Sequence, residues 1–257
     1  MSSDRLDGTT SLVTGAGRGI GQAVTQALAA RGARIAAADL DAQRAGDVAA
    51  ALAGTGHRGY PLDVRDSAAV EAVVSRVEDE LGPISLLVSV AGVLHTGPAV
   101  ELTDEQWTET FAVNVHGVFH CLRSVGRRMA GRGAGCIVTV SSNAATIPRM
   151  HMSAYAASKA ASAQFTRCLG LELAQHGIRC NVVSPGSTDT AMLHSMHADG
   201  EAAQASIDGA PAEYRVGIPL RKLARPADVA DAVAFLASDR AGHITMQNLV
   251  VDGGAAL

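Results

Sequence analysis

The sequence lacks any apolar run that approaches the roughly 20 residues needed to cross a bilayer. Its first ten residues (MSSDRLDGTT) also lack the basic and apolar regions of a secretory signal peptide. Neither sign of charge is in large excess, because 21 Lys and Arg stand against 25 Asp and Glu, for a net charge of −4. The charge balance gives no sign of the basic surface that binds nucleic acid. We expect a globular protein of the cytoplasm.

Cysteine is scarce, and its spacing predicts neither disulfides nor a zinc site. The chain has four cysteines, at Cys121, Cys136, Cys168 and Cys180. They form no C-x-x-C pair, so we expect buried thiols. His116 and His120 lie four residues apart, as two ligands on one helix face would, but no third ligand accompanies them. We therefore predict that the protein holds no metal.

Short β-branched or apolar runs alternate with longer alanine-rich stretches along the 257 residues. The predicted strands are SLVTG (11–15), ARIAAAD (33–39), RGYPLD (58–63), SLLVSV (85–90), CIVTVS (136–141), IRCNVVS (178–184) and QNLVVD (247–252). The predicted helices lie at 19–31, 41–53, 66–80, 105–130, 153–175 and 226–237. Such alternation implies parallel strands joined by right-handed crossovers, with helices on both faces of the sheet. The sequence thus predicts an α/β protein with one doubly wound Rossmann domain, 1–257, of about seven strands.

One long segment interrupts this alternation. Residues 187–218 follow the sixth predicted strand, and their composition is mixed rather than charged. Long irregular loops in compact domains are usually functional, and ligands bind at the carboxyl edge of such sheets. We predict that residues 187–218 form a lid over the substrate.

A glycine-rich turn, TGAGRGIG (14–21), joins the first predicted strand to the first predicted helix. Glycines permit a tight turn and close approach of the backbone to a diphosphate, which then sits at the helix N-terminus. The predicted diphosphate-binding residues are Gly15, Arg18, Gly19, Ile20 and Gly21. Because it lies between a strand and a helix, this turn predicts a dinucleotide-binding site.

Asp39 ends the second predicted strand, eighteen residues after Gly21. A carboxylate at that place accepts hydrogen bonds from the adenosine ribose and repels the 2′-phosphate of NADP. Arg18 could favour NADP instead, but a lone exposed arginine is more often solvated or bound to the diphosphate. We therefore predict NAD as the cofactor.

Tyr155 and Lys159 lie four residues apart in a helix-forming run, SAYAASKAASAQF, so both side chains lie on one helix face. An ammonium held close to a phenol stabilises the phenolate and lowers the tyrosine pKa from its usual value of about 10. Ser142, just after an apolar strand, would share a substrate oxygen with Tyr155. A Tyr-x-x-x-Lys pair alone occurs by chance in many helices, and the glycine-rich turn strengthens the catalytic interpretation.

This turn, followed by Asn114, Ser142, Tyr155 and Lys159, resembles the short-chain dehydrogenase/reductase family across essentially the whole chain. The resemblance implies that Asn114 anchors a water that links Lys159 to solvent, and that Lys159 contacts the nicotinamide ribose. It implies further cofactor contacts from Asp63, Val64, Gly92, Pro185, Gly186, Thr188 and Thr190. One departure is visible, because SVAG (89–92) replaces the family's Asn-Asn-Ala-Gly and leaves open how the neighbouring strands are braced.

Longer segments narrow the resemblance to a branch of the family that oxidises dihydroxy-cyclohexadiene carboxylates to aromatic catechols in siderophore or related biosynthesis. These segments include IVTVSSNAATIPRMHMSAYAASKAA, RCNVVSPGSTDT and GIPLRKLARP. The resemblance implies an NAD-dependent oxidoreductase of CH–CH donors, in which Tyr155 removes a hydroxyl proton while the carbinol hydride passes to the nicotinamide. It also implies a homotetramer built through the helices at 105–130 and 153–175.

The predicted substrate-binding residues are Ser142, Arg149, Met152 and Tyr155. Arg149, on the loop before the catalytic helix, would bind the substrate carboxylate through its planar guanidinium. If Arg149 projected into water instead, Arg221, Lys222 or backbone amides beside the lid would take the carboxylate. Four methionines would either line an apolar part of the pocket or fill gaps in the core: Met150, Met152, Met192 and Met196.

Alternatives for the activity stay open at the level of sequence. A dihydro-3-hydroxyanthranilate would need nearly the same pocket, with an amine in place of one hydroxyl. A short-chain carbonyl reductase of another substrate would keep the same catalytic residues. A catalytically silent NAD sensor or scaffold would keep the fold, although all four catalytic residue types are present.

Overall fold

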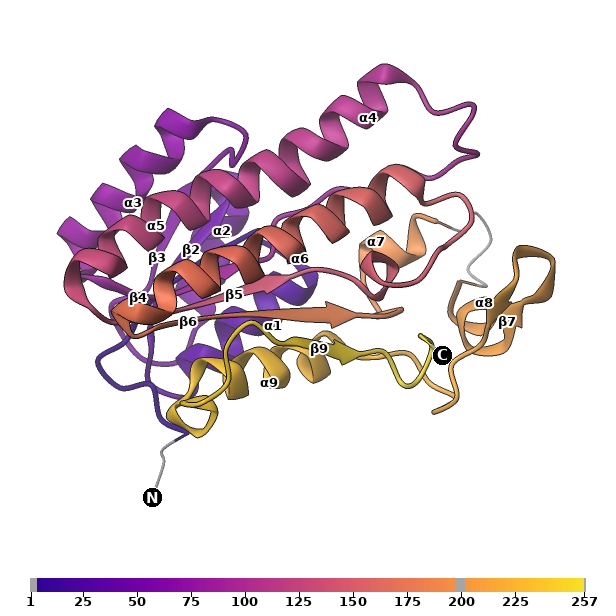
Figure 1. Ribbon diagram of the computed structural model, residues 1–257. Helices are drawn as coiled ribbons and strands as arrows, with labels where there is room; N and C mark the ends of the chain where they lie inside the picture. Colours follow the sequence, from indigo (N-terminus) through magenta and orange to yellow (C-terminus); the bar gives the residue numbers. More distant parts are fainter. Residues whose placement is uncertain (1–3, 197–201, 257) are drawn as a thin grey trace.

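A computed structural model of the chain describes residues 4–196 and 202–256, and its centre is one parallel sheet (Figure 1). The sheet has seven strands in the order β3-β2-β1-β4-β5-β6-β9, with every neighbouring pair parallel. The strands are β1 (Thr10–Thr14), β2 (Arg34–Asp39), β3 (Arg58–Pro61), β4 (Ile84–Ser89), β5 (Gly135–Val140), β6 (Ile178–Pro185) and β9 (Asn248–Val251). The predicted fold class is confirmed, and each predicted strand is found within two residues of its expected ends.

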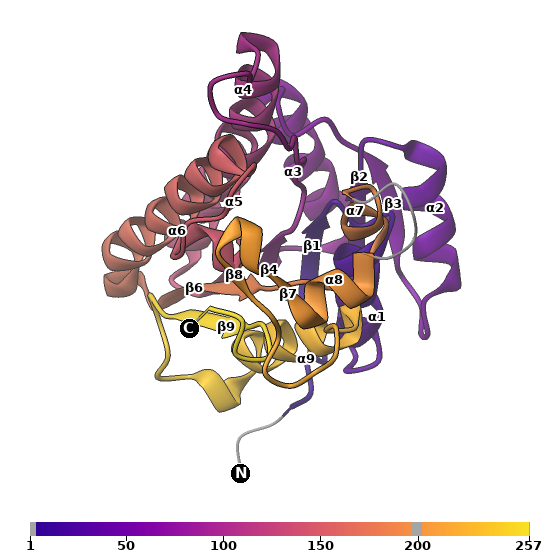
Figure 2. The ribbon, with the colours of Figure 1, turned by 90° about the vertical axis from the view of Figure 1, so that its right-hand side faces the viewer.

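Helices cover both faces of the sheet, as Figures 1 and 2 show. One face carries α1 (Gly19–Ala29), α2 (Ala42–Ala51) and α9 (Pro226–Ala237), and the other carries α3 (Ser67–Leu81), α5 (Val118–Arg132) and α6 (Ser153–Leu173). Neighbouring residues of a strand point to opposite faces, so in β1 Val13 packs in the first layer and Leu12 in the second. All of β1 is buried, as expected of a strand covered on both sides.

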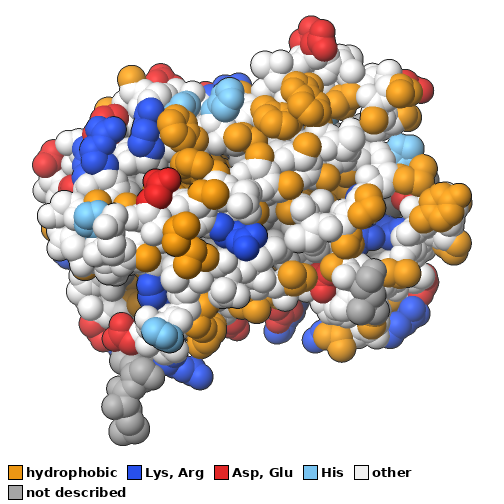
Figure 3. Space-filling model, viewed as in Figure 1, with side chains coloured by type: hydrophobic (Ala, Val, Ile, Leu, Met, Phe, Trp, Pro, Cys, Tyr) orange, Lys and Arg blue, Asp and Glu red, His pale blue; other side chains and the backbone are white. Residues whose placement is uncertain are grey.

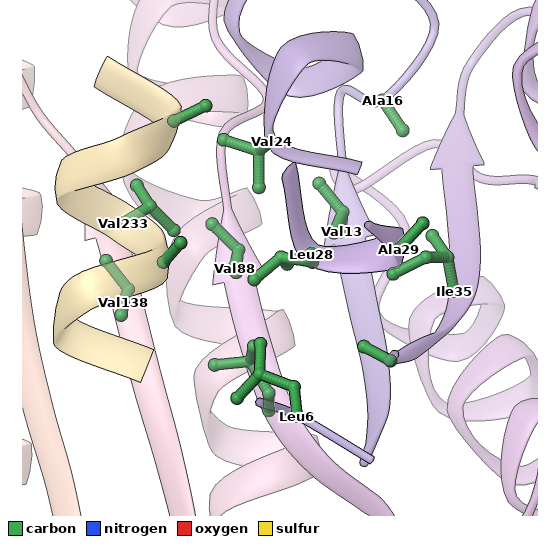
Figure 4. Close-up of a cluster of buried hydrophobic side chains, with 14 of the residues drawn as sticks. Leu6, Val13, Ala16, Val24, Leu28, Ala29, Ile35, Val88, Val138 and Val233 are labelled. Atoms are coloured by element: carbon green, nitrogen blue, oxygen red, sulfur yellow. The ribbon is translucent and has the colours of Figure 1, made fainter. Parts of the chain in front are cut away.

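The packing of α1 positions the start of the predicted dinucleotide site. Figure 4 shows Val24 and Leu28 of α1, four residues apart, facing the sheet near Val233 of α9 and Val88 of β4. This apolar contact holds the helix along the sheet. The N-terminal end of α1 therefore lies at the carboxyl end of β1, directly after the glycine-rich turn.

The helix predicted at 105–130 is found at 104–132, but its middle is not α-helical. α4 (Asp104–Phe111) passes directly into a π-helical stretch, Ala112–Gly117, which continues as α5. Within this stretch the buried Asn114 side chain bonds to the backbone of Val93, outside the helix. Such wide turns inside helices are frequent at functional sites.

The segment predicted as an irregular lid contains short elements of its own. α7 (Ala191–His194) and α8 (Ala202–Asp208) precede an antiparallel hairpin of β7 (Gly209–Ala210) and β8 (Arg215–Val216). Figure 1 shows α8 and β7 beyond the arrowhead of β6, at the carboxyl edge of the sheet. Residues 197–201 of the predicted lid lie outside the described residues.

Short 3₁₀ turns complete the described chain, at Asn143–Ala145, Ala174–His176, Pro211–Glu213 and Asp239–Ala241. Within residues 4–196 and 202–256, no helix is both long and apolar enough to span a membrane.

Candidate active site

A cleft of about 660 Å³ opens along the carboxyl ends of β1, β2 and β4. Its volume lies in the range of sites for cofactors and other small molecules. The predicted cofactor-binding residues that line it are Gly15, Arg18, Gly19, Ile20, Gly21, Asp39, Val64, Gly92, Tyr155, Lys159 and Thr190. The structure therefore brings the turn, the predicted ribose acceptor and the catalytic helix to one cavity.

The glycine-rich turn has the backbone geometry of an anion site at the N-terminus of α1. Gly15 and Gly19 have φ angles of 65° and 55°, a region that residues with a Cβ rarely adopt. A Cβ on Gly15 would lie 2.7 Å from Cα of Ala91, and one on Gly21 would collide with the Gly15 carbonyl. The N-cap residue, Arg18, makes no side-chain hydrogen bond to the first turn, which leaves those N–H groups for an anion.

Asp39 is held at the wall of the cleft by two backbone donors. Its Oδ2 accepts from the N–H of Gly17 at 2.9 Å, and its Oδ1 accepts from the N–H of Asp41 at 3.0 Å. The carboxylate keeps further lone pairs for the hydroxyls of a ribose. Arg44 also lines the cleft, but its guanidinium pairs with Asp41 at 3.2 Å.

Of the two expected cofactor contacts after β3, Asp63 and Val64, only Val64 lines the cleft. Its carboxylate forms a bidentate pair with Arg65, 2.7 Å between Nη2 and Oδ2, and this hydrogen bonding lowers the pKa of Asp63. Leu62, Val64 and Arg65 line the cleft. Val64 therefore lies at the cavity as predicted, whereas the Asp63 carboxylate is engaged by Arg65.

Thr14 braces the strands where the sequence departs from the family pattern. Its Oγ1, at the end of β1, accepts from the N–H groups of Val90 at 3.2 Å and Ala91 at 3.4 Å, just after β4. Gly92 follows them, and a Cβ there would lie 3.2 Å from Nζ of Lys159. The hydroxyl of Thr14 thus fixes the loop against which Lys159 packs.

Tyr155, Lys159 and Ser142 lie together where the cleft meets a second, smaller pocket. Tyr155 and Lys159 of α6 are 8% and 4% exposed, and Nζ lies 5.7 Å from the centre of the tyrosine ring. Nζ donates to the carbonyl of Val140, the last residue of β5, at 3.1 Å. Ser142 Oγ accepts from the N–H of Ala144 at 3.2 Å. The end of β5 and the first turns of α6 therefore position all three side chains.

Burial governs the pKa values of both titratable groups. It raises the pKa of Tyr155 above its ordinary value, and a hydrogen bond with Ser142 offsets part of this rise. It lowers the pKa of Lys159 to about 8. The lowering of the tyrosine pKa by Lys159 stays a prediction. In the chain by itself the ammonium lies 5.7 Å from the centre of the tyrosine ring and donates to the carbonyl of Val140, and burial is the main influence on the pKa of Tyr155.

Asn114 ties three segments together from its π-helical turn. Its Nδ2 donates to the carbonyl of Val93 at 2.9 Å and to Ser158 Oγ at 3.0 Å, and its Oδ1 accepts from the N–H of Val93 at 2.9 Å. Ser158 Oγ in turn donates to the carbonyl of Tyr155 at 2.7 Å. Both Nδ2 protons are used, so within the side chain only Oδ1 keeps a lone pair for the predicted water.

The smaller pocket, of about 120 Å³, extends from Ser142 and Tyr155 to Met196 and Arg215 of the segment predicted as a lid. The predicted residues that line it are Ser142, Arg149, Met152, Tyr155, Pro185, Gly186, Thr188 and Thr190. Arg149 is half-buried, and its Nη2 donates to the carbonyl of Ala255 at 3.0 Å. Arg221 and Lys222 are exposed, and Arg221 pairs with Asp208 at 2.6 Å.

Sequence reasoning missed Arg215 of β8, whose side chain also lines the smaller pocket. No local pattern marks it, because it lies in the short hairpin of the lid segment. Only the fold of that segment brings Arg215 beside a pocket whose other residues come mainly from the segment between β5 and α6, the start of α6, the end of β6 and residues 186–196.

The remaining candidates take different places. Met192 and Met196 line the smaller pocket with Met152, whereas Met150 is exposed. His194 pairs with Asp189 at 2.8 Å outside the catalytic set. In the part of the chain that the structure describes, no group of three His, Cys, Asp or Glu could hold a metal ion.

The fold and the site define a dinucleotide-dependent oxidoreductase, with a tyrosine and a lysine at the mouth of a Rossmann cleft. The chain belongs to the short-chain dehydrogenase/reductase family. It matches the family model described as Enoyl-(Acyl carrier protein) reductase over residues 15–256.

Two named relatives match over nearly their full length. The 2,3-dihydro-2,3-dihydroxybenzoate dehydrogenase of Bacillus subtilis (strain 168) is 52% identical over 259 residues, covering 100% of this chain and 99% of the relative. The enzyme of the same name from Escherichia coli (strain K12) is 43% identical over 257 residues, covering 98% of each. Among solved structures, 3-ketoacyl-(acyl-carrier-protein) reductase from Brucella melitensis, complexed with NADH, is 30% identical with a TM-score of 0.88 and covers 98% of this chain and 100% of that one. The resemblance first seen in the sequence is confirmed.

Proposed function

We propose that the protein is an NAD-dependent dehydrogenase that oxidises 2,3-dihydro-2,3-dihydroxybenzoate to 2,3-dihydroxybenzoate. The observation that carries the proposal is the position of Tyr155, which lines both the larger cleft and the smaller pocket that contains Arg149. A base at that junction can take a proton from an alcohol whose hydride leaves toward the cleft. The relatives at 52% and 43% identity carry the name of this activity.

NAD is the proposed cofactor, and when bound it supplies the hydride acceptor. The turn at Gly15 and Gly21 fits a diphosphate, since a Cβ at either residue would meet backbone. Asp39 would accept from the adenosine ribose and repel a 2′-phosphate. On the nicotinamide side, Lys159 would hold the ribose and Thr188 the carboxamide.

Tyr155 is the proposed base, and it takes the proton of the substrate hydroxyl as a phenolate. Ser142 Oγ donates a hydrogen bond to the same substrate oxygen. Lys159 stabilises the phenolate once the positive charge of the oxidised cofactor is present beside it. A lysine with a pKa of about 8 can both hold and release a proton near neutral pH, which suits it to pass protons toward water at Asn114.

The proposed reaction balances with the substrate and NAD as its only reactants. The alcohol loses a hydride from carbon and a proton from oxygen, which leaves a ring ketone and one proton on Tyr155. The ketone then shifts a proton from the adjacent ring carbon to its oxygen and becomes an aromatic catechol. Aromatisation makes oxidation the downhill direction.

We also propose a homotetramer that assembles through α5 and α6. Phe119 of α5 and Leu171 of α6 are exposed, and Figure 3 shows apolar side chains gathered over this face. The proposed compartment is the cytoplasm, because the four cysteines are free thiols, as a reducing environment maintains them. Sedimentation of the protein and of Leu171→Lys tests the assembly, which the variant should weaken.

The test of the activity is an incubation of the protein with NAD and a panel of ring alcohols, followed by the absorbance of the reduced cofactor. The panel holds 2,3-dihydro-2,3-dihydroxybenzoate, the same diol without its carboxylate, and a dihydro-3-hydroxyanthranilate. We expect the first to give the highest kcat/KM and 2,3-dihydroxybenzoate as product. A higher kcat/KM for the anthranilate would show that the proposed substrate is wrong. NAD binding without turnover of any alcohol would indicate a sensor or scaffold instead of an enzyme.

A further inference from the structure

A second arginine faces the smaller pocket from the lid hairpin. Arg215 of β8 is half-buried, and burial lowers the pKa of its guanidinium. Its Nη2 donates to Ser187 Oγ at 2.8 Å and lies 3.5 Å from Ser206 Oγ. Ser187 follows β6 and Ser206 belongs to α8, so the guanidinium lies between the end of the sheet and the lid.

Neither pocket arginine has a carboxylate at ion-pair distance among residues 4–196 and 202–256. Arg149 bonds to the Ala255 carbonyl and Arg215 to serine hydroxyls, all of them neutral acceptors. By contrast, Arg221 of the same lid segment pairs with Asp208 at 2.6 Å in solvent. The charges of Asp252 and Glu213 act on Arg149 and Arg215, respectively, from beyond ion-pair distance, and burial still lowers the pKa of both guanidiniums. A partly buried cation without a close counter-charge is costly, and two of them beside one small pocket repel each other.

We propose that Arg215 and Arg149 bind the substrate carboxylate together, one from the lid hairpin and one from the loop before α6. This inference rests on the proposed function, since it assigns the anion of that substrate. A carboxylate offers two oxygens with lone pairs for more than one guanidinium, so one anion can satisfy both arginines. The anion supplies a negative charge at ion-pair distance, which neither Asp252 nor Glu213 does.

The arrangement makes Arg215 a specificity-determining residue that couples the substrate to the lid. The carboxylate joins the loop before α6 to the hairpin, which the serine bonds already connect to the end of β6. A neutral ring alcohol makes no such link. Carboxylated substrates should therefore hold the hairpin to the loop before α6, whereas their neutral analogues should not.

The test compares Arg215→Met and Arg215→Lys with Arg221→Met, a matched control on the same segment whose guanidinium lies outside the pocket. Two substrates are used with NAD, 2,3-dihydro-2,3-dihydroxybenzoate and the same diol without its carboxylate. We expect Arg215→Met to lower kcat/KM for the carboxylated diol by about thirtyfold or more, and to leave the neutral diol nearly unchanged. Arg215→Lys should recover part of the loss, because it restores the charge but not the fork, and Arg221→Met should behave as wild type.

Equal losses on both diols would make Arg215 a structural residue of the hairpin and would overturn the inference. Calorimetric titration with benzoate, in the presence of NAD, separates this result from a failure of the proposed function. If the wild type turned over neither diol but bound benzoate about tenfold or more tightly than Arg215→Met, the anion site would stand and the proposed reaction would fall. If benzoate bound the wild type and Arg215→Met equally, or bound neither, the anion site would fall.

Discussion

The two halves of the site are built in different ways. The cofactor half is centred on a backbone turn at the end of β1, the glycine-rich turn closed against Ala91, with side chains such as Asp39 around it. The substrate half is assembled from residues of the loop before α6, the end of β6 and the lid hairpin, and its Arg149 is anchored on Ala255 near the C-terminus. A half centred on a backbone turn follows from the fold, whereas a half made of distant side chains can change its ligand without changing the fold.

The residue shared by both halves should give the largest effect. Tyr155→Phe should lower kcat by about a hundredfold or more, because the proton acceptor is lost while the ring still packs. NAD and benzoate should bind nearly as well as in wild type, and isothermal titration checks both. Tyr214→Phe, at an exposed tyrosine of the lid segment, is the matched control. Activity above about a tenth of wild type would remove Tyr155 from the base role.

In the cofactor half, the burial of Lys159 should make the free energy of unfolding depend on pH. Its pKa is about 8 in the folded chain and 10.5 ordinarily, so between these values the unfolded chain binds more protons and the free energy of unfolding rises with pH. The cost of burying the charge is present in full below pH 8 and gone above 10.5. Lys159→Met removes it, so the variant's stability relative to wild type should fall with rising pH, by about 1.4 kcal/mol per unit at most.

Denaturant unfolding of wild type and Lys159→Met across that pH window measures the difference in their free energies of unfolding. The ionisation of tyrosines that both proteins share cancels in this difference. Parallel stability curves would mean that Lys159 keeps its ordinary pKa in the fold. The same variant should also bind NAD more weakly, because the proposed ribose contact is lost.

Arg149 probes the substrate half alone. Arg149→Met should lower kcat/KM for the carboxylated diol by about thirtyfold or more, since a desolvated charge pair is broken. The neutral diol should react as with wild type, and NAD affinity should not change. A matched loss on both diols would give Arg149 the role of anchoring Ala255 rather than the substrate.

Asp39 probes the cofactor half with the smallest expected effect. Asp39→Asn keeps an oxygen for the N–H of Gly17 and removes the charge, so the preference for NAD over NADP should narrow by about tenfold. The ratio of kcat/KM for the two cofactors measures it, with Asp47→Asn on the exposed side of α2 as the control for net charge. A wild-type enzyme that used both cofactors equally would contradict the electrostatic role of Asp39.

The same contrast explains how far the sequence predicted the structure. The sheet, the glycine-rich turn and the Tyr155–Lys159 face were predictable because each depends on local spacing. The π-helical turn at Asn114 and the bracing by Thr14 were not, because both arise from contacts between segments far apart in the chain. Arg215 escaped for the same reason, since its place at the pocket depends on how the lid hairpin folds.

The hydride that leaves the substrate carbinol can be followed with an isotope. 2,3-Dihydro-2,3-dihydroxybenzoate deuterated at both carbinol carbons is oxidised with NAD, and mass spectrometry of the cofactor and the product locates the label. We expect one deuterium in each reduced cofactor and none on the ring of 2,3-dihydroxybenzoate, because the second deuterium is lost to solvent as the ketone aromatises. Reduced cofactor without deuterium, or deuterium retained on the ring, would contradict the proposed hydride transfer.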